Sequence, residues 1–328
     1  MACEWIAPIP ETSGGGGGGA GSLKCPSSTV APAPDCTDAL PNGTLSFGGG
    51  LTMQDCVQLG DFGSAQVPTW VGGMVFSPED PDRLLVVGGS ASESAALYSI
   101  PVQRDPDCHV AALGIAEKIA DLPNADPIAV GPDKSLLIGI VSYSDPPLTK
   151  IGRMSPGAMS LEKELDLTDF GVTRPVSGLG VVPEGYDGAG HLAFTTFPDS
   201  NVSSYGRWYT TTPSDGATDP LDFQSVTPGS DLPWSASFVY LGAQNRLGAS
   251  PKLLIVDYQD RELKAYDVNA DGTPNITLPT LVLSVPPNAG TSQQVVGLWG
   301  TALDPTTGDL LIALQQEHDL IALRGVGR

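Results

Sequence analysis

A segment that begins as a polar turn and continues as an apolar strand recurs five times in this chain. The recurring strands begin at Leu84, Leu136, His191, Leu253 and Leu310, at intervals of 52 to 62 residues. A turn that contains Gly, Pro or Asp precedes each of these strands, as in SPEDPDRLLVVGG and DPTTGDLLIALQQ. A repeat of this length, with several short strands in each unit, is typical of similar sheets arranged in an array.

We therefore predict an all-β protein, a β-propeller of five four-stranded blades over residues 44–328, with six blades as the alternative. The last unit ends after three predicted strands and lacks a fourth. We expect residues 56–62 to supply it by pairing with the last blade. Such pairing closes the ring and removes the two sheet edges that an open array would expose.

The repeats resemble bacterial β-propellers of the broad NHL, SMP-30 and YncE-like group, in a secreted or lipoprotein form. Units such as DPTTGDLLIAL and AYDVNADGTP carry this resemblance, which covers about residues 44–328. It rests on the texture of the repeats and not on a diagnostic motif. It therefore implies a fold and no particular activity.

The charge of the chain limits its partners. The sequence has 37 acidic and 16 basic residues in 328, a formal net charge of −21. Such a surface repels phosphate backbones and anionic lipid headgroups, so we expect no nucleic-acid binding. No apolar stretch approaches the length of a transmembrane helix. We expect a monomer.

Residues 1–43 are predicted to be a disordered tether and loop, because a hexaglycine run and Pro-rich stretches cannot bury a core. The chain as written has no signal peptide. Ala2-Cys3 before a Gly-rich spacer nevertheless resembles the start of a mature bacterial lipoprotein, with Cys3 as the lipid anchor. An ordinary cysteine in a tail is the alternative. We expect an extracytoplasmic location, in the periplasm, at the outer membrane or at the cell surface.

Four further cysteines allow two disulfides in any of three pairings. Cys56 opens the expected closing strand, and Cys108 lies near a turn of the adjacent first blade. We therefore favour Cys56–Cys108 together with Cys25–Cys36. Free thiols in a cytosolic protein are the alternative.

Three tryptophans recur near the start of the predicted inner strands, which line the central channel of a propeller. The candidate ligand-binding residues at this channel mouth are Trp70, Trp234, Trp299, Asn124 and Arg174. One interpretation is an aromatic rim around a pocket. The other, which we favour, is that the indoles fill the gaps between blades, because large aromatic side chains are mostly buried packing.

The loops between second and third strands form a candidate acidic face. They contribute Asp145, Asp199, Asp260, Glu317 and His318. Converging carboxylates hold a cation or act as an acid–base pair, whereas dispersed ones are only a solvated surface.

DVNADG places Asp267, Asn269 and Asp271 at alternate positions before a glycine, as in the first half of a Ca²⁺ loop. The twelfth position is Leu278 and not the bidentate Glu, so this is not an EF-hand. A turn stabilised by its own Asn and Asp side chains is the favoured interpretation. Ca²⁺ is the one candidate cofactor.

Catalytic motifs are scarce. The sequence has only three histidines, and it has no G-x-S-x-G nucleophile elbow. We therefore predict a non-catalytic, exported propeller that is not an enzyme and that binds a ligand or protein partner through its acidic, Trp-bearing loop face. The alternative is a metal-dependent hydrolase or lyase, lactonase- or glycosidase-like, with carboxylates at the channel mouth.

Overall fold

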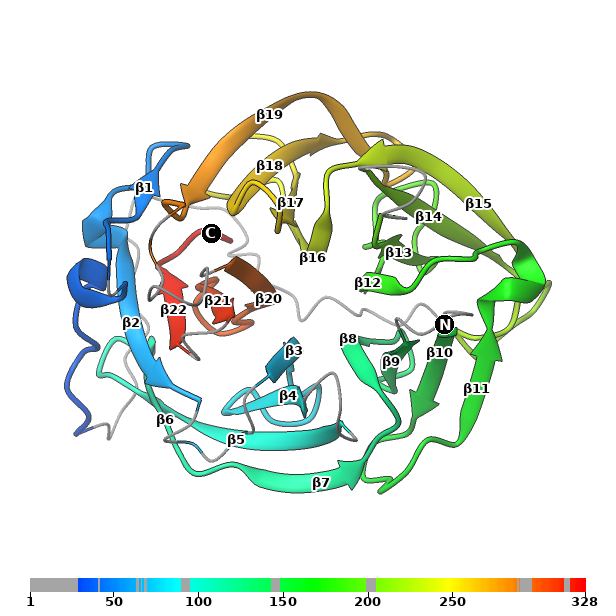
Figure 1. The fold of residues 1–328 in the computed structure, drawn as a ribbon, viewed down its shortest axis with the longest axis horizontal. Coiled ribbons are helices and arrows are strands. Elements are labelled where there is room, and N and C mark those ends of the chain that lie inside the picture. Colours follow the sequence, from blue (N-terminus) through cyan, green and yellow to red (C-terminus); the bar gives the residue numbers. More distant parts are fainter. Residues whose placement is uncertain are drawn as a thin grey trace, which may run out of the picture.

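Five small antiparallel sheets stand in a ring around a central axis in the computed structural model (Figure 1). The prediction of an all-β five-bladed propeller is therefore confirmed. The described residues are 29–40, 42–62, 65, 67, 70–89, 95–142, 148–198, 205–287, 289, 297–315 and 319–328.

Each blade has four strands, which follow one another from the axis to the rim and alternate in direction. The inner strands of blades 1 to 5 are β3 (Trp70–Phe76), β8 (Ala125–Val130), β12 (Val176–Val181), β16 (Ser235–Leu241) and β20 (Gly297–Leu303). The second strands are β4 (Arg83–Gly89), β9 (Leu136–Ser142), β13 (Leu192–Thr196), β17 (Lys252–Asp257) and β21 (Leu310–Gln315). The third strands are β5 (Ala96–Arg104), β10 (Leu148–Met154), β14 (Gly206–Pro213), β18 (Glu262–Val268) and β22 (Asp319–Leu323).

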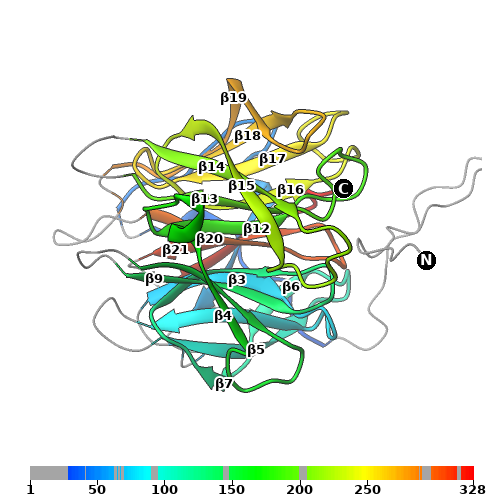
Figure 2. The same cartoon turned by 90° about the vertical axis from the view of Figure 1, so that its right-hand side faces the viewer.

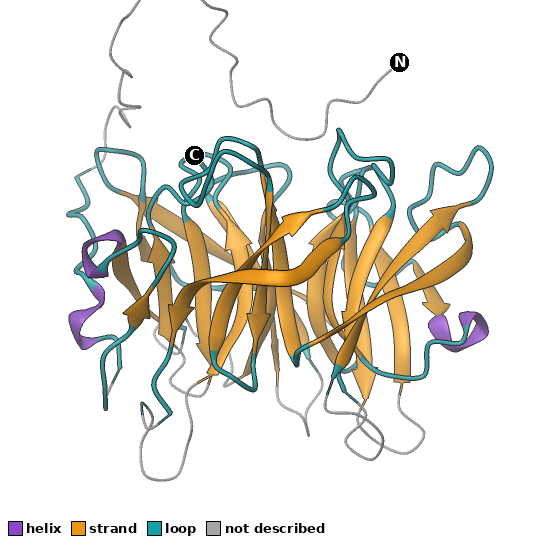
Figure 3. Ribbon diagram, turned by 90° about the horizontal axis from the view of Figure 1, so that it is seen from above, coloured by secondary structure: helices purple, strands orange, loops and turns teal. Residues whose placement is uncertain are grey.

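The outer strands are β7 (Glu117–Asp121), β11 (Lys163–Asp166), β15 (Phe223–Leu232), β19 (Pro274–Ser284) and β2 (Cys56–Asp61). Two short strands add to this plan. They are β1 (Ser46–Phe47), which pairs with β19, and β6 (Val110–Leu113), which pairs with the far end of β5. Three short 3₁₀ helices lie at the periphery (Figure 3): η1 (Cys36–Asp38), η2 (Met53–Asp55) and η3 (Leu167–Phe170).

The second strands form the cores between blades. All of β13 is buried, and β9 is buried except at its last residue. Each of these strands has a neighbouring blade on both of its faces, so both faces are apolar, and this explains the continuous apolar runs in the repeat. The outer strands have one free side, and residues 275–280 of β19 are exposed. Figure 2 shows this order, with inner strands such as β12 and β20 between the outer strands β19 and β7.

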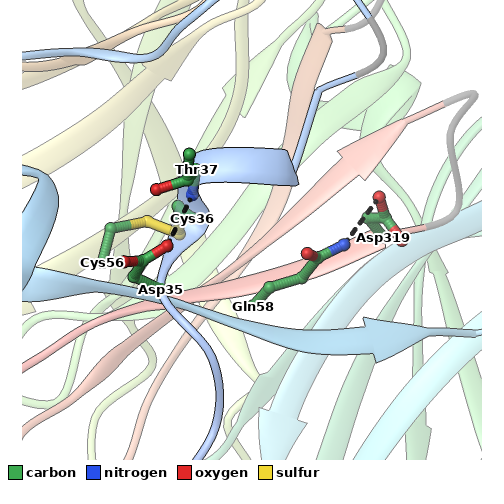
Figure 4. The surroundings of a disulfide bond; sticks show 6 residues. All are labelled: Asp35, Cys36, Thr37, Cys56, Gln58 and Asp319. Atoms are coloured by element: carbon green, nitrogen blue, oxygen red, sulfur yellow. Dashed lines mark hydrogen bonds between the residues drawn. A yellow bond between two sulfur atoms is a disulfide. The ribbon is translucent and has the colours of Figure 1, made fainter.

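The N-terminal strand closes the ring, as predicted. β2 pairs antiparallel with β22, with Cys56 opposite Leu323 and Val57 opposite Ala322. Gln58 also donates a side-chain hydrogen bond of 3.4 Å to Asp319 (Figure 4). β22 thus has a partner on each side, and the edge that the C-terminus would otherwise leave open is covered.

Both predicted disulfide pairings are wrong, because the structure joins Cys36 to Cys56 (Figure 4). The chain before β2 folds back along it, and an isolated bridge pairs Asp35 with Val57. Cys36 is thereby brought to a Cα–Cα distance of 5.4 Å from Cys56. Cys108 is disulfide-bonded as well. Cys25 lies outside the described residues.

The tether predicted for residues 1–43 remains a prediction for residues 1–28, which the structure does not describe. The part that is described is attached to the ring. Cys36, Ala39 and Leu40 are buried in the core shared with blades 4 and 5, and the carbonyl of Pro34 accepts a hydrogen bond of 2.8 Å from the Gln58 N–H. No helix among the described residues is long and apolar enough to cross a bilayer.

A second connection between blades 1 and 5 is polar. We call Arg104, His109, Asp304, Asp309 and Arg324 the seam. Arg104 donates to Asp304 through both terminal nitrogens, at 2.7 and 3.2 Å, and the Asp304 side chain is fully buried. Residue 104 ends a strand of the first blade and residue 304 follows a strand of the last, so this ion pair fastens the ring beside the closing strand.

The second half of the seam is centred on the buried carboxylate of Asp309. It accepts hydrogen bonds of 2.7 Å from both His109 and Arg324 and one of 2.8 Å from the Gly325 N–H. Burial by itself would raise the pKa of Asp309, but the His109 hydrogen bond and the Arg324 charge hold it below its usual value. The chain after β22 is therefore pinned to the first blade.

Candidate functional site

All five inner strands carry a β-bulge near their first residues. A bulge inserts an extra residue that leaves the ladder, and it redirects side chains locally. The register shifts lie between Val71 and Met74, Ala125 and Ile128, Val176 and Gly178, Ser235 and Ser237, and Leu298 and Thr301. The intervening residues thus sit at one level around the axis, and they include Gly72, Asp126 and Trp299.

Two of these bulge residues, which belong to blades on either side of blade 1, form a hydrogen bond with each other. The indole Nε1 of Trp299 donates a hydrogen bond of 2.9 Å to Oδ1 of Asp126. Trp299 belongs to blade 5 and Asp126 to blade 2, and β3 of blade 1 contacts the inner strands of both. Blade 1 has Gly72 at this level, where a Cβ atom would lie only 2.8 Å from Oδ1 of Asp126. The absence of a side chain at Gly72 is what allows the two residues to meet.

Asp126 is a buried carboxyl with a displaced pKa. The residue is 8 % exposed, and burial raises its pKa to about 7, while the hydrogen bond from Trp299 acts in the opposite direction. Its second oxygen, Oδ2, accepts no hydrogen bond from the described residues. A carboxyl that changes charge near neutral pH can both accept and donate a proton, so its position at the ring axis makes Asp126 a candidate acid–base group.

Hydroxyl groups continue this polar level around the ring. Ser237 and Thr301 share a hydrogen bond of 2.8 Å between blades 4 and 5. Thr195 of blade 3 contacts Ser177 at 3.0 Å, and the Ser235 hydroxyl donates to it at 3.2 Å from blade 4. The inner ends of blades 3, 4 and 5 are therefore joined by side-chain hydrogen bonds that a purely apolar axis would lack.

An aromatic cluster supports the Trp299 indole. Phe197 stacks on it with ring centroids 5.7 Å apart, and Tyr258 meets it edge-on at 4.9 Å. Tyr258 also contacts Trp234 edge-on at 5.8 Å. The structure thus brings two of the three predicted tryptophans, Trp234 and Trp299, into one cluster. Trp70 begins β3, but its side chain lies outside the described part.

The two other candidate ligand-binding residues lie apart from this cluster. Asn124 is exposed just before β8, and its carbonyl accepts a hydrogen bond of 2.8 Å from the Val141 N–H. Arg174 donates at 2.9 Å to the carbonyl of Tyr205. Neither has a hydrogen bond to Asp126 or Trp299 in the described part of the chain, and their ligand-binding role stays a prediction.

Most of the predicted acidic face cannot be placed. Asp145, Asp199, Glu317 and His318 lie outside the described residues. Asp260 is described, and it accepts a hydrogen bond of 3.2 Å from Lys264, which also contacts Asp257 at 2.8 Å. Within the ranges that the structure describes, no group of three His, Cys, Asp or Glu side chains is arranged to hold a metal ion.

The DVNADG segment forms a turn between β18 and β19. Oδ1 of Asp271 accepts hydrogen bonds from the N–H and hydroxyl of Thr273, at 3.0 and 2.7 Å. Asn269 donates to the same hydroxyl at 3.0 Å, and Asp267 pairs with Lys252 at 2.6 Å. These three side chains are thus engaged in the turn and an ion pair, as expected for the favoured interpretation. Ca²⁺ binding stays a prediction.

Sequence reasoning missed Asp126. The only signal was the acid that opens the apolar run DPIAV (126–130), and an acid at the end of a strand is ordinarily at the surface. What makes Asp126 unusual is that it is buried and accepts a hydrogen bond from Trp299, a residue 173 positions away. Sequence spacing does not show such a contact.

Comparisons with known proteins give only distant similarity. No model of a known protein family matches the sequence, and no curated protein matches it. Among solved structures, the PQQ domain of pyranose dehydrogenase from Coprinopsis cinerea is similar with a TM-score of 0.47 at 10% identity, covering 87% of this chain and 98% of that one.

Two other solved structures resemble the chain at a similar level. The soluble aldose sugar dehydrogenase from Escherichia coli has a TM-score of 0.44 at 11% identity, covering 78% of this chain and 84% of that one. The periplasmic gluconolactonase from Pseudomonas aeruginosa has a TM-score of 0.43 at 12% identity, covering 74% and 64%.

These neighbours contradict the prediction of a non-catalytic binding protein that is not an enzyme. The three structures are described as two dehydrogenases and a gluconolactonase, and we withdraw that prediction. At 10–12% identity the likeness concerns the fold alone and assigns no activity. The five radial sheets make the chain a β-propeller, and the comparisons place it in no narrower family.

Proposed function

We propose that this protein is an enzyme, a hydrolase or lyase, in which Asp126 transfers a proton at the axis of the propeller. One observation carries the proposal. A buried carboxyl with a pKa of about 7 lies among the inner strands, with one oxygen held by Trp299 and the other without a hydrogen bond from the described residues. A general acid or base works best when its pKa is close to the working pH.

Hydrolysis of a neutral cyclic ester is the simplest reaction that fits this arrangement. The Asp126 carboxylate accepts a proton from a water molecule while the water oxygen attacks the carbonyl carbon. The ring C–O bond then breaks, and the departing alkoxide takes the proton back from Asp126. Glycosidic substrates need the same proton donor at the departing oxygen. The net charge of −21 disfavours polyanionic substrates.

The substitution Asp126→Asn tests the proposal. Its amide oxygen can still accept the Trp299 hydrogen bond, but it cannot carry the proton. We expect kcat/KM on a panel of lactones and aryl glycosides to fall by about 100-fold or more. On lactones, the activity of the native protein should rise with pH through a midpoint near 7, where the base ionises.

Asp271→Asn is the matched control, because it removes the same charge from an exposed turn where Asn can make the same hydrogen bonds. It should leave kcat/KM unchanged. A folded Asp126→Asn variant with native activity on any substrate that the protein turns over would refute the assignment.

We also propose an extracytoplasmic location with Cys3 as a lipid anchor, as in the bacterial secreted propellers that the repeats resemble. The Cys36–Cys56 disulfide supports the location, since such bonds persist in oxidising compartments. When the protein is alkylated in its native cells, mass spectrometry should find that Cys36 and Cys56 react with the alkylating reagent only after reduction. Cys3 should carry an acyl group. Free thiols at both positions would contradict the location, and an unmodified Cys3 would contradict the anchor.

A further inference from the structure

We infer that Trp299 is a positioning residue for Asp126, because it holds one carboxylate oxygen so that the other faces the substrate. Gly72, which has no side chain, leaves the space in which Trp299 reaches Asp126. The inference rests on the proposed function and deepens it, since it names the residue on which the acid–base group depends.

The Trp299 ring is itself fixed by its neighbours. Phe197 stacks on it at 5.7 Å with planes inclined by 27°, and Tyr258 abuts it edge-on at 4.9 Å with planes at 88°. Two rings at different angles leave an indole little freedom to tilt. Packing of the ring therefore directs the Nε1–H of Trp299 at Oδ1 of Asp126. The orientation of this hydrogen bond is set by the indole and not by the carboxyl.

The contact between Trp299 and Asp126 also depends on Gly72, which lies between them. A Cβ atom at position 72 would lie 2.7 Å from the Asp126 carbonyl oxygen and 2.8 Å from its Oδ1. Neighbouring Gly73 is equally confined, with its Cβ position 2.5 Å from the Ile128 nitrogen. Gly72 and Gly73 of blade 1 therefore leave room for the contact between Trp299 of blade 5 and Asp126 of blade 2. Any side chain at these two positions would displace that contact.

No other ionisable group among the described residues lies close enough to Asp126 to set the charge of its carboxyl. Strands β3, β9, β12 and β20, which pack around β8, carry no ionisable side chain. Strand β4 also contacts β8, and it carries Arg83 at the end remote from Asp126, beside Asp80, Glu117 and the Ser99 hydroxyl. The hydrogen bond from Trp299 is thus the interaction that favours the ionised carboxyl, and it works against burial.

Trp299→Phe is the direct test, because it keeps an aromatic ring and removes the N–H. Without the donor the ionised carboxylate loses stabilisation, so the pKa of Asp126 should rise from about 7 by roughly one pH unit. The ¹³C shift of the Asp126 carboxyl, assigned by its loss in Asp126→Asn, reports this directly. The midpoint of kcat/KM against pH should rise by the same amount, which leaves about a fifth of the activity at pH 7 and most of it at high pH.

Trp208→Phe is the control. Trp208 is a fully buried indole whose Nε1 has no hydrogen-bond partner among the described residues, so its replacement removes similar volume without removing a bond. It should leave both midpoints in place. An unchanged Asp126 midpoint in Trp299→Phe, or an equal shift in Trp208→Phe, would overturn the inference.

A measurement on the unaltered ring covers the case in which Trp299→Phe does not fold. In the native protein the Trp299 indole N–H proton resonance should titrate with a midpoint near 7, and in Asp126→Asn it should not. A flat native titration would refute the inference. This readout needs no turnover. It separates the two proposals, since an active Asp126→Asn variant would refute the catalytic role while leaving a titrating indole to support the positioning.

Discussion

At the scale of the residue, one carboxyl and its surroundings determine what the ring centre can do. Asp126 sits in a bulge, is nearly excluded from water and meets an indole from a distant part of the chain. Trp299 is recognisable as a candidate from the sequence, because tryptophans recur near the inner strands. Asp126 is not, because its hydrogen bond to Trp299 joins two blades that are not adjacent, and no sequence pattern marks such a contact.

The raised pKa of Asp126 makes a contribution to stability that depends on pH. In the folded state the carboxyl is protonated up to about pH 7, and in the unfolded state only up to its ordinary value of 3.8. The folded state therefore binds the extra proton, and the stability contributed by Asp126 is complete below 3.8 and lost as the pH rises to about 7.

Asp126→Asn, which stays neutral, should escape this loss. From pH 4 to pH 8 its free energy of unfolding should gain up to about 4 kcal/mol on that of the native protein. Urea unfolding of both proteins across this pH range measures the difference between their free energies of unfolding. The titration of every other group is common to both proteins, so it cancels in this difference. A difference that does not vary with pH would show that Asp126 has an ordinary pKa in the fold.

At the scale of the element, the strands and their closure were predictable because they follow from period and edge chemistry. Apolar runs at regular intervals mark the second strands, and a last blade short of one strand predicts that β2 supplies it. The disulfide was not predictable, because the fold-back of residues 34–36 along β2 leaves no periodic signal. Its one visible trace is a bridge between Asp35 and Val57.

At the scale of the whole molecule, the ring is closed twice between its first and last blades, by the β2–β22 pairing and by the seam. The seam joins residues about 200 positions apart, such as Arg104 and Asp304. The seam is not visible in the sequence, because charged residues at strand ends are ordinarily solvated, and only the closure of the ring buries these.

Arg104→Met should destabilise the whole ring. It leaves the buried Asp304 carboxylate without its cation, and losing one partner of a buried pair costs about 3 kcal/mol or more. The urea midpoint measures this loss. Arg207→Met is the control, since Arg207 pairs with Asp231 on an exposed part of blade 3 and should cost less than about 1 kcal/mol. Equal losses in the two variants would show that the seam does not fasten the ring.

The five inner-strand bulges have a consequence for how such a protein changes over evolutionary time. A residue set outside the ladder can be exchanged without breaking the hydrogen bonds that hold its blade. Each blade therefore has a position outside the ladder near the axis, and these positions include Gly72, Asp126, Ser177, Ala236 and Trp299. Exchanging the residue at such a position, other than the confined Gly72, would alter the chemistry at the centre while the blades around it stay the same.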